Sequence, residues 1–143
     1  PLIINDAVDI AKEIGADGVH VGLSDMDIKK AREILGSGAI IGASAHNTAE
    51  ALAAQAAGAD YIGCGAVFKT GTKTDATALS HSELASICKA VRIPAVAIGG
   101  ITEENLPLLN GSGIAGAAVI SALFAQDDIG AAAKRLRQLA DML

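Results

Sequence analysis

Gly58-Ala-Asp-Tyr-Ile-Gly-Cys-Gly-Ala-Val-Phe-Lys-Thr-Gly-Thr-Lys73 contains the end of a predicted helix, a strand and a polar loop in direct succession. Gly58 is the type of residue that ends a helix, and the apolar run that starts at Tyr61 predicts a strand to Gly65. The loop ends in Thr70, Thr72 and Lys73, which offer two hydroxyls and an ammonium. These residues are typical either of a phosphate-binding loop or of a solvated loop, and the local sequence leaves both open.

The same junction of helix end and strand recurs along the chain. Gly15-Ala16-Asp17 repeats Gly58-Ala59-Asp60, and Gly113-Ile114-Ala115 is a weaker copy. Hydrophobic periodicity and capping residues predict unbroken alternation of strands and helices. Strands are expected at 2–4, 18–22, 39–42, 61–65, 94–98 and 116–120, and helices at 8–14, 28–35, 48–57, 80–91, 103–109 and 129–143.

Such alternation is typical of an α/β protein, either an open doubly wound sheet or a (β/α)8 TIM-type barrel. The strands look like continuous apolar runs, as parallel strands buried on both faces do. Polar residues follow nearly every strand, which favours the barrel. A barrel needs eight units, and six are visible. Because the chain starts at Pro1 in a strand-like run, we expect either two missing N-terminal units or an open arc of six.

Composition predicts a single domain over residues 1–143, since 51% hydrophobic and 19% charged residues exclude disorder. No apolar run is long enough to cross a membrane. A net charge of -5 and 2% aromatic residues argue against nucleic-acid binding. Cys64 and Cys88 lack metal-site spacing and indicate reduced, structural thiols of a cytoplasmic protein.

Candidate functional residues follow the strand ends, which meet on one face of a parallel barrel. Asp6 and Asp25 end neighbouring strands and can hold Mg²⁺ together with substrate phosphates; alternatively, each carboxylate caps a helix or a turn. Gly99-Gly100 and Ile120-Ser121 follow the last two strands, where backbone N–H groups and a short helix can bind phosphate.

Other motifs are less specific. Gly63-x-Gly65 places two glycines where the backbone can approach another group closely, but Phe68 occupies the third position of a dinucleotide fingerprint, which excludes that motif. His46 follows a strand and is either a general base or a structural hydrogen bonder. His20 is expected in the core and His81 at the surface.

Taken together, these motifs resemble those of the thiamine-phosphate synthase family over essentially the whole chain. The resemblance rests on the order and spacing of Ile4-Asn5-Asp6, Gly18-Val-His-Val-Gly22 with Asp25, Gly42-Ala-Ser-Ala-His46, Gly58-Ala-Asp-Tyr-Ile-Gly63, Thr70-Gly-Thr-Lys73, Ala97-Ile-Gly-Gly-Ile101 and Ile120-Ser121. That family has a (β/α)8 barrel, so the resemblance implies that the six units correspond to strands three to eight.

The resemblance implies a transferase of thiamine biosynthesis that joins a hydroxymethylpyrimidine diphosphate to a thiazole phosphate and releases diphosphate. Mg²⁺ would be held by Asp6 and Asp25. The pyrimidine diphosphate would be held by Asn5, Ser44 and Lys73, with Ser44 and Lys73 as the catalytic pair. The thiazole phosphate would be held by Thr70, Gly71, Thr72, Gly100, Ile120 and Ser121. In the family's dissociative mechanism diphosphate leaves first, and no strong base is needed.

Three departures from the family pattern matter. The family's Gln-Leu-Arg-Glu-Lys segment, which grips the pyrimidine diphosphate, has no counterpart here. Ala7 stands where Arg is frequent, and Leu23 where Gln is. We therefore expect poor turnover from these 143 residues alone, and an open sheet edge that favours a homo-oligomer or a complementing chain.

Two rival functions remain open. One is the thiazole tautomerase branch of the superfamily, which shares the barrel and a strand-end histidine such as His46 but generally lacks the Thr-x-Thr-Lys loop. The other is a non-catalytic partial barrel that keeps the thiazole-phosphate site.

Overall fold

A single parallel sheet organises the molecule. The computed structural model describes residues 1–22, 26–69 and 78–143. Its strands pair in chain order and are β1 (Ile3–Asn5), β2 (Gly18–Val21), β3 (Ile40–Ala45), β4 (Tyr61–Gly65), β5 (Ala95–Ile98) and β6 (Gly116–Ala118). The helices are α1 (Val8–Glu13), α2 (Ile28–Leu35), α3 (Thr48–Ala57), α4 (His81–Ala90), the 3-10 helix η1 (Leu106–Leu109), α5 (Ser121–Phe124) and α6 (Ile129–Ala140).

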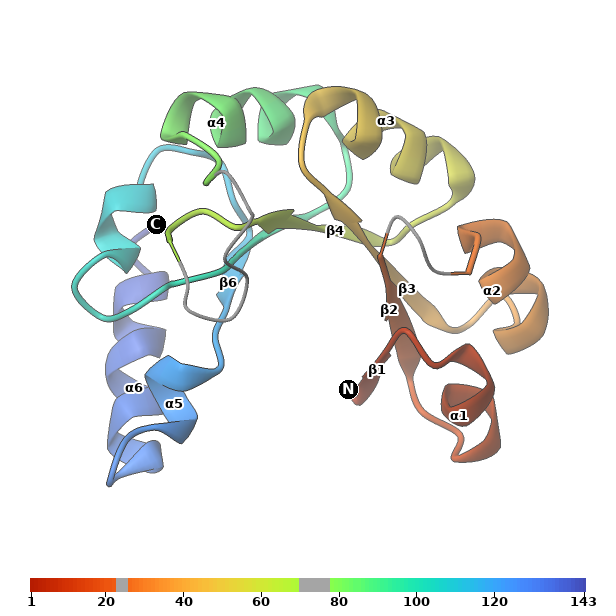
Figure 1. Ribbon diagram of the computed structural model, residues 1–143, viewed down its shortest axis with the longest axis horizontal. Coiled ribbons are helices and arrows are strands. Elements are labelled where there is room, and N and C mark those ends of the chain that lie inside the picture. Colours follow the sequence, from red (N-terminus) through yellow and green to blue (C-terminus); the bar gives the residue numbers. More distant parts are fainter. Residues whose placement is uncertain (23–25, 70–77) are drawn as a thin grey trace.

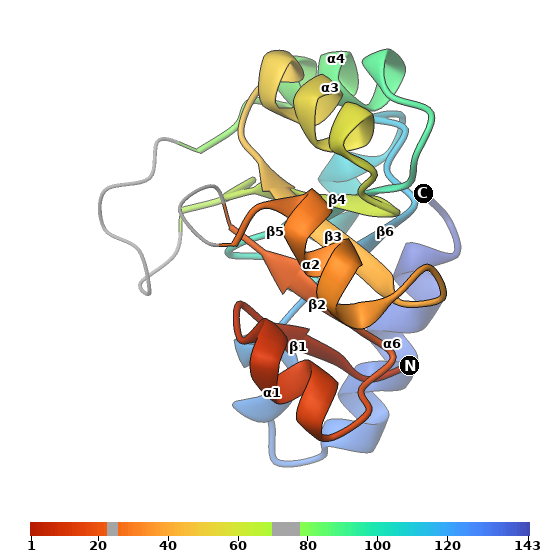
Figure 2. The ribbon, with the colours of Figure 1, turned by 90° about the vertical axis from the view of Figure 1, so that its right-hand side faces the viewer.

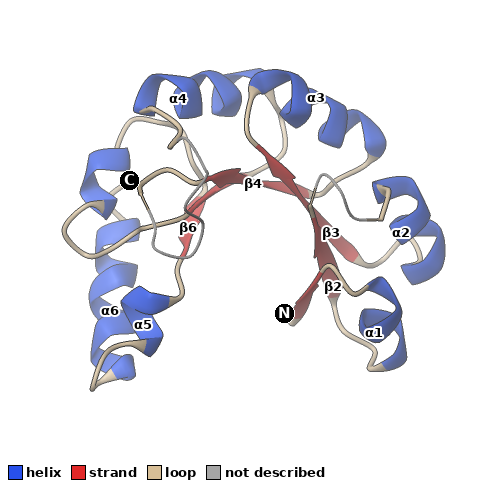
Figure 3. Cartoon of the chain, in the orientation of Figure 1, coloured by secondary structure: helices blue, strands red, loops and turns tan. Residues whose placement is uncertain are grey.

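The sheet curves into an arch, and α1 to α4 cover its convex side (Figure 1). A view turned by 90° shows α1 and α2 in front of the strands and α3 above them, beside α4 (Figure 2). In the described sheet β1 and β6 stand at opposite ends, and each has one neighbouring strand (Figure 3). A doubly wound sheet would carry helices on both faces, whereas this arch carries them outside, as a barrel does. The α/β class and the partial, barrel-like arc are thus confirmed, and the numbering of the strands as three to eight stays a prediction.

The two faces of the sheet differ in chemistry. Side chains on the convex face are apolar and fully buried under the helices, as at Val19, Ile41 and Ile62. On the concave face the alternate positions of β3 and β4 carry glycine or polar residues such as Ser44 and Tyr61, while those of β5 carry Val96 and Ile98; these four side chains line a cavity. The expectation of burial on both faces is therefore wrong for the concave face. Glycines on the concave face hid the alternation between the two faces, so the strands resembled continuous apolar runs in the sequence.

Small residues let the helices lie close to the sheet. Ala31 in α2, Ala51 in α3 and Ala132 in α6 are each completely buried. In the last helix the sequence predicted Ala133, Leu136, Leu139 and Ala140 as inward. Leu136 is buried and Leu139 and Ala140 are half buried against the core, as predicted, but Ala133 is exposed and Ala132 is buried instead.

Two short elements also differ from expectation. The helix predicted over 103–109 is a single 3-10 turn, with Pro at its first positions. The four-residue helix α5 begins at Ser121. The sequence predicted only that a short helix could start after the last strand, without its bounds.

The repeated Gly-Ala-Asp junction has a structural explanation. The Asp60 carboxylate accepts a 2.7 Å hydrogen bond from the Ile41 N–H, and the Asp60 N–H donates to the Ile41 carbonyl at 2.7 Å. In the first copy of the junction the Asp17 carboxylate accepts from the Leu2 N–H at 2.6 Å. Each aspartate thus satisfies an N–H at the start of the neighbouring strand. The third, weaker copy has Ala115, which makes only the backbone bond.

Arg32 ties the Asp60 junction to α2. Its guanidinium lies 2.7 Å from the Asp60 carboxylate and also donates to the carbonyls of Gly58 and Ala39. Burial raises the pKa of Asp60, but the hydrogen bond from Ile41 and then the bond to and charge of Arg32 outweigh it, so the pKa lies below its ordinary value.

Both cysteines are free thiols, as predicted. Cys64 is fully buried on the convex side of β4, and this burial, with a smaller contribution from Cys88, raises its pKa to about 12. A thiol with such a pKa is an inert core residue at neutral pH. In the described part of the chain, no helix has the length and apolar character needed to span a membrane.

We predict that Asp60→Asn lowers the free energy of unfolding by about 1 kcal/mol at pH 7, because a charged hydrogen bond is lost and solvent screens this half-exposed pair. A lowered folded-state pKa gives stability that is present above about pH 4 and is lost as the pH falls through the folded pKa. The difference between variant and wild type should therefore shrink in acid. Urea titrations at several pH values test this, with the exposed Asp127→Asn as matched control. A constant difference down to about pH 3 would contradict the linkage.

Candidate active site

A cavity of about 560 Å³ lies on the concave face of the arch. Its walls come from the inward positions of the strands and from the segments that follow β4, β5 and β6. The carboxyl ends of parallel strands meet at this edge, which is where barrel enzymes build their sites. The predicted site residues on its wall are Asn5, Ser44, Gly100, Ile120 and Ser121.

The other predicted residues fall into two groups. Asp6 lies next to Asn5 at the end of β1. Asp25, Thr70, Gly71, Thr72 and Lys73 lie outside the described residues. Five of the described residues thus line one cavity and Asp6 directly follows one of them, and the roles assigned to these residues stay predictions.

Asn5 and Asp6 form a small unit at the end of β1. Asp6 has a φ of 62°, a left-handed conformation that is uncommon for a residue with a side chain. Its N–H donates to the His20 carbonyl at 2.8 Å, and the Asn5 side-chain amide donates to the Asp6 carboxylate at 2.7 Å. These bonds hold an exposed carboxylate at the edge where parallel barrels bind ligands.

A carboxylate of this kind suits Mg²⁺, which prefers oxygen ligands. Within the described ranges, no cluster of at least three His, Cys, Asp or Glu residues could hold a metal by itself. A magnesium ion at Asp6 would thus need oxygens from elsewhere, such as substrate phosphates, and this is the coordination that Mg²⁺ commonly has.

Gly100 brings the loop after β5 against the segment after β4. Its φ is 64°, and an added Cβ would lie 2.6 Å from the Lys69 carbonyl oxygen. The Asn105 side chain fixes the loop by donating to the Gly100 carbonyl at 2.8 Å. This glycine therefore permits a close approach to the backbone of Lys69, the residue that precedes Thr70 in the sequence.

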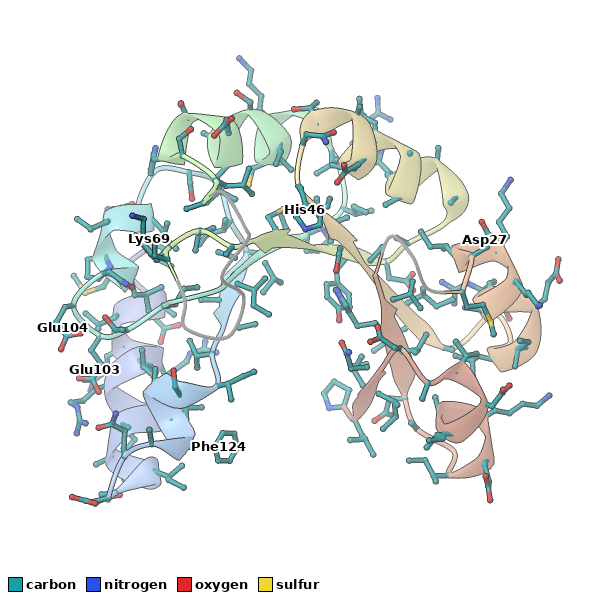
Figure 4. The ribbon with its side chains drawn as sticks, in the orientation of Figure 1. Asp27, His46, Lys69, Glu103, Glu104 and Phe124 are labelled. Atoms are coloured by element: carbon teal, nitrogen blue, oxygen red, sulfur yellow. The ribbon has the colours of Figure 1, made fainter. Side chains whose placement is uncertain are left out.

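Apolar side chains complete this half of the cavity. Ile98 on β5 is 41% exposed and Ile120, directly before α5, is 72% exposed, although both are large hydrophobic residues. Phe124 in α5 projects toward the space between the two ends of the arch (Figure 4).

His20 lies at the cavity wall, so its prediction as a core residue is wrong. His20 is only half buried and lines the cavity, instead of lying in the core. Its Nδ1 lies 3.0 Å from the Tyr61 hydroxyl and its Nε2 lies 3.1 Å from the Ser44 hydroxyl. Tyr61 was interpreted only as strand. The sequence signal that could have placed His20 correctly is the alternation of side chains within each of β2, β3 and β4. This alternation is consistent with His20, Ser44 and Tyr61 on one face of the sheet.

His46 lies at the carboxyl end of β3 and lines the same cavity (Figure 4). Its Nδ1 is 3.1 Å from Glu50, and its backbone N–H donates to the same carboxylate at 2.7 Å. Burial raises the pKa of Glu50, but the bonds from His46 and Asn47 outweigh it and lower the pKa overall. His81 is exposed, as expected, and contacts the Asn110 carbonyl at 3.1 Å.

The fold and cavity thus define a protein of the parallel βα-barrel class with a strand-end site. Residues 1–123 match the family described as thiamine monophosphate synthase. The chain belongs to this family.

Individual relatives agree with that assignment. The thiamine-phosphate synthase of Ruminiclostridium cellulolyticum is 51% identical over 139 residues, covering 97% of this chain and 66% of its own length. That of Methanobrevibacter smithii is 58% identical over 123 residues, covering 86% of this chain and 59% of its own. The chain thus spans 66% and 59% of the length of these two relatives.

Solved structures show the same fold. Thiamine phosphate pyrophosphorylase from Pyrococcus furiosus superposes with a TM-score of 0.89 at 42% identity, covering 97% of this chain and 66% of that one. A 3-hexulose-6-phosphate synthase superposes with a TM-score of 0.69 at 24% identity over 92% of this chain and 66% of that one, which shows the fold alone.

Proposed function

We propose that this protein couples 4-amino-2-methyl-5-hydroxymethylpyrimidine diphosphate with 4-methyl-5-hydroxyethylthiazole phosphate and releases diphosphate. Family membership across nearly the whole chain supports this proposal. The observation that carries it is the convergence of Asn5, Ser44, Gly100, Ile120 and Ser121 on one cavity, although they lie far apart in the sequence.

The two substrates would occupy opposite halves of the arch. Asn5 and Ser44 belong to β1 and β3, and with Lys73 they would hold the pyrimidine diphosphate. Gly100, Ile120 and Ser121 follow β5 and β6, and would hold the thiazole phosphate. Thr70, Gly71 and Thr72 would join this second half, because Gly100 packs against the Lys69 backbone. The new bond would then form over β4, between the two halves.

The residues suit a dissociative reaction. The C–O bond between the pyrimidine methylene and the diphosphate breaks, and its electron pair leaves with the diphosphate. The thiazole nitrogen then donates its lone pair to the methylene cation and forms the C–N bond. No proton is removed in either step, so the site needs hydrogen-bond donors for the departing charge instead of a strong base. Asn5, Ser44 and Lys73 would supply these donors.

Mg²⁺ would be held by Asp6 and Asp25 together with diphosphate oxygens. When bound there, it would neutralise charge on the leaving group. The Asn5 amide, which donates to Asp6, would keep that carboxylate oriented toward the ion.

We predict that Ser44→Ala lowers kcat/KM for the pyrimidine diphosphate by about 10- to 100-fold, the loss expected for one hydrogen bond to a charged group. The KM for the thiazole phosphate should stay unchanged. Steady-state kinetics with each substrate varied in turn measure both values. Ser86→Ala, on the outer helix α4, is the matched control. Equal losses toward both substrates would contradict the assignment of Ser44 to one half.

A thiazole tautomerase remains the second candidate, because His46 lines the cavity and is oriented by Glu50. For a synthase, we predict that His46→Ala reduces coupling only a few-fold, since no base is required. For a tautomerase, the same change should abolish proton transfer. Assays of both reactions on His46→Ala, with His81→Ala as control, separate the two functions.

The sheet edges are a further part of the proposal. In the described sheet β1 and β6 each pair on one side, and a strand edge readily adds another strand. We predict that the 143-residue chain associates with itself or with a complementing chain. Light scattering across a range of concentrations measures this, and a constant monomer mass would contradict it.

A further inference from the structure

Three polar side chains on adjacent strands form one hydrogen-bonded chain inside the cavity. His20 on β2 stands between Tyr61 on β4 and Ser44 on β3, with contacts of 3.0 Å and 3.1 Å. The rings of His20 and Tyr61 are 5.4 Å apart and tilted by 41°. All three residues are half buried and line the cavity wall.

The register of the sheet makes this chain possible. His20, Gly42 and Tyr61 lie in one row across three strands. A Cβ on Gly42 would overlap the Tyr61 ring, so only glycine lets the phenol reach across β3 to the imidazole. Gly63 stands opposite Ser44 in the next row, where an added Cβ would lie 2.9 Å from His20 Cε1. Both glycines therefore clear space for the histidine and tyrosine rings.

The direction of the hydrogen bonds follows from the chemistry of the groups. A phenol is a stronger donor than an alcohol, and an unprotonated imidazole nitrogen is a strong acceptor. Burial raises the pKa of Tyr61, so its hydroxyl keeps its proton. The favoured order is Tyr61 O–H to His20 Nδ1, then His20 Nε2–H to the Ser44 oxygen. In this order the Ser44 proton is left to point into the cavity.

We propose that Tyr61 and His20 are positioning residues that fix Ser44 as a hydrogen-bond donor toward the diphosphate of the pyrimidine substrate. This inference rests on the proposed function, in which Ser44 contacts that diphosphate. An anion needs donors, and a Ser44 whose proton pointed at His20 would present only its oxygen lone pairs. The protein's net charge of -5 does not favour binding of an anion, so hydrogen-bond donors inside the cavity must stabilise the diphosphate.

Kinetics of Tyr61→Phe test the positioning role. The variant keeps the ring but removes the donor to Nδ1, and kcat/KM for the pyrimidine diphosphate should fall about three- to tenfold, as for one neutral hydrogen bond. The KM for the thiazole phosphate should not change. In a Ser44→Ala background the same substitution should have no further effect, since the group that it positions is gone. Additive losses would overturn the proposal, because a merely structural role would persist without Ser44.

Variants of His20 give a second test. His20→Gln can place an amide N–H near the position of Nε2 and should retain more activity than His20→Leu, which has no donor. Equal activity of the two variants would overturn the role of the Nε2 donor. His81→Gln serves as the control for a histidine outside the cavity. Thermal unfolding of each variant identifies losses that arise from the fold.

A spectroscopic measurement separates this inference from the proposed function. Nitrogen-15 NMR of the histidine side chains should show His20 with Nδ1 unprotonated and Nε2 protonated, the signal being assigned with His20→Gln. Tyr61→Phe should shift the Nδ1 resonance. Protonation at Nδ1 in the wild type would overturn the proposed positioning of Ser44 by Tyr61 and His20, even if synthase activity is found. If His20 has the expected tautomer but no synthase activity is found, the proposed substrate is refuted. The hydrogen-bonded order of Tyr61, His20 and Ser44 is then still supported.

Discussion

The lateral register of the strands is the constraint on which the rest of the structure depends. Asn5, His20, Gly42 and Tyr61 lie in one row across β1 to β4. Parallel pairing with this register brings residues from distant parts of the chain to one height on the concave face. The junctions at Asp17 and Asp60 help to hold the register, because each carboxylate bonds to an N–H at the start of the neighbouring strand.

The division between the two faces explains how one sheet both folds and carries a site. Apolar side chains on the convex face pack under alanine-rich helices and form the core. Glycines on the concave face leave space, and a few polar side chains occupy it. Hydrophobic burial therefore does not compete with the site for the same positions, and the exposed Ile98 and Ile120 lie on the wall of the cavity.

Much of this could be predicted from the sequence because the signals are local. The strand and helix order follows from hydrophobic period and from caps such as Asn47, whose side chain bonds to the Glu50 N–H. The site residues at strand ends follow from the rule that parallel strands share one functional edge. Errors arose where an alternating strand resembles a continuous apolar one. Gly42 and Gly63 hid the alternation between the two faces of the sheet, so His20 was interpreted as a core residue. In α6 Leu136, Leu139 and Ala140 were correctly predicted as inward, but Ala132 is buried in place of Ala133.

The sequence by itself determined the α/β class, the succession of units and the family to which the chain is similar, since these depend on periodicity and on motifs within short stretches. Only the tertiary structure decided that His20 reaches both Tyr61 and Ser44, and that Gly100 packs on Lys69. Those contacts depend on sheet curvature and register, which set distances between residues 24 to 41 positions apart in the chain.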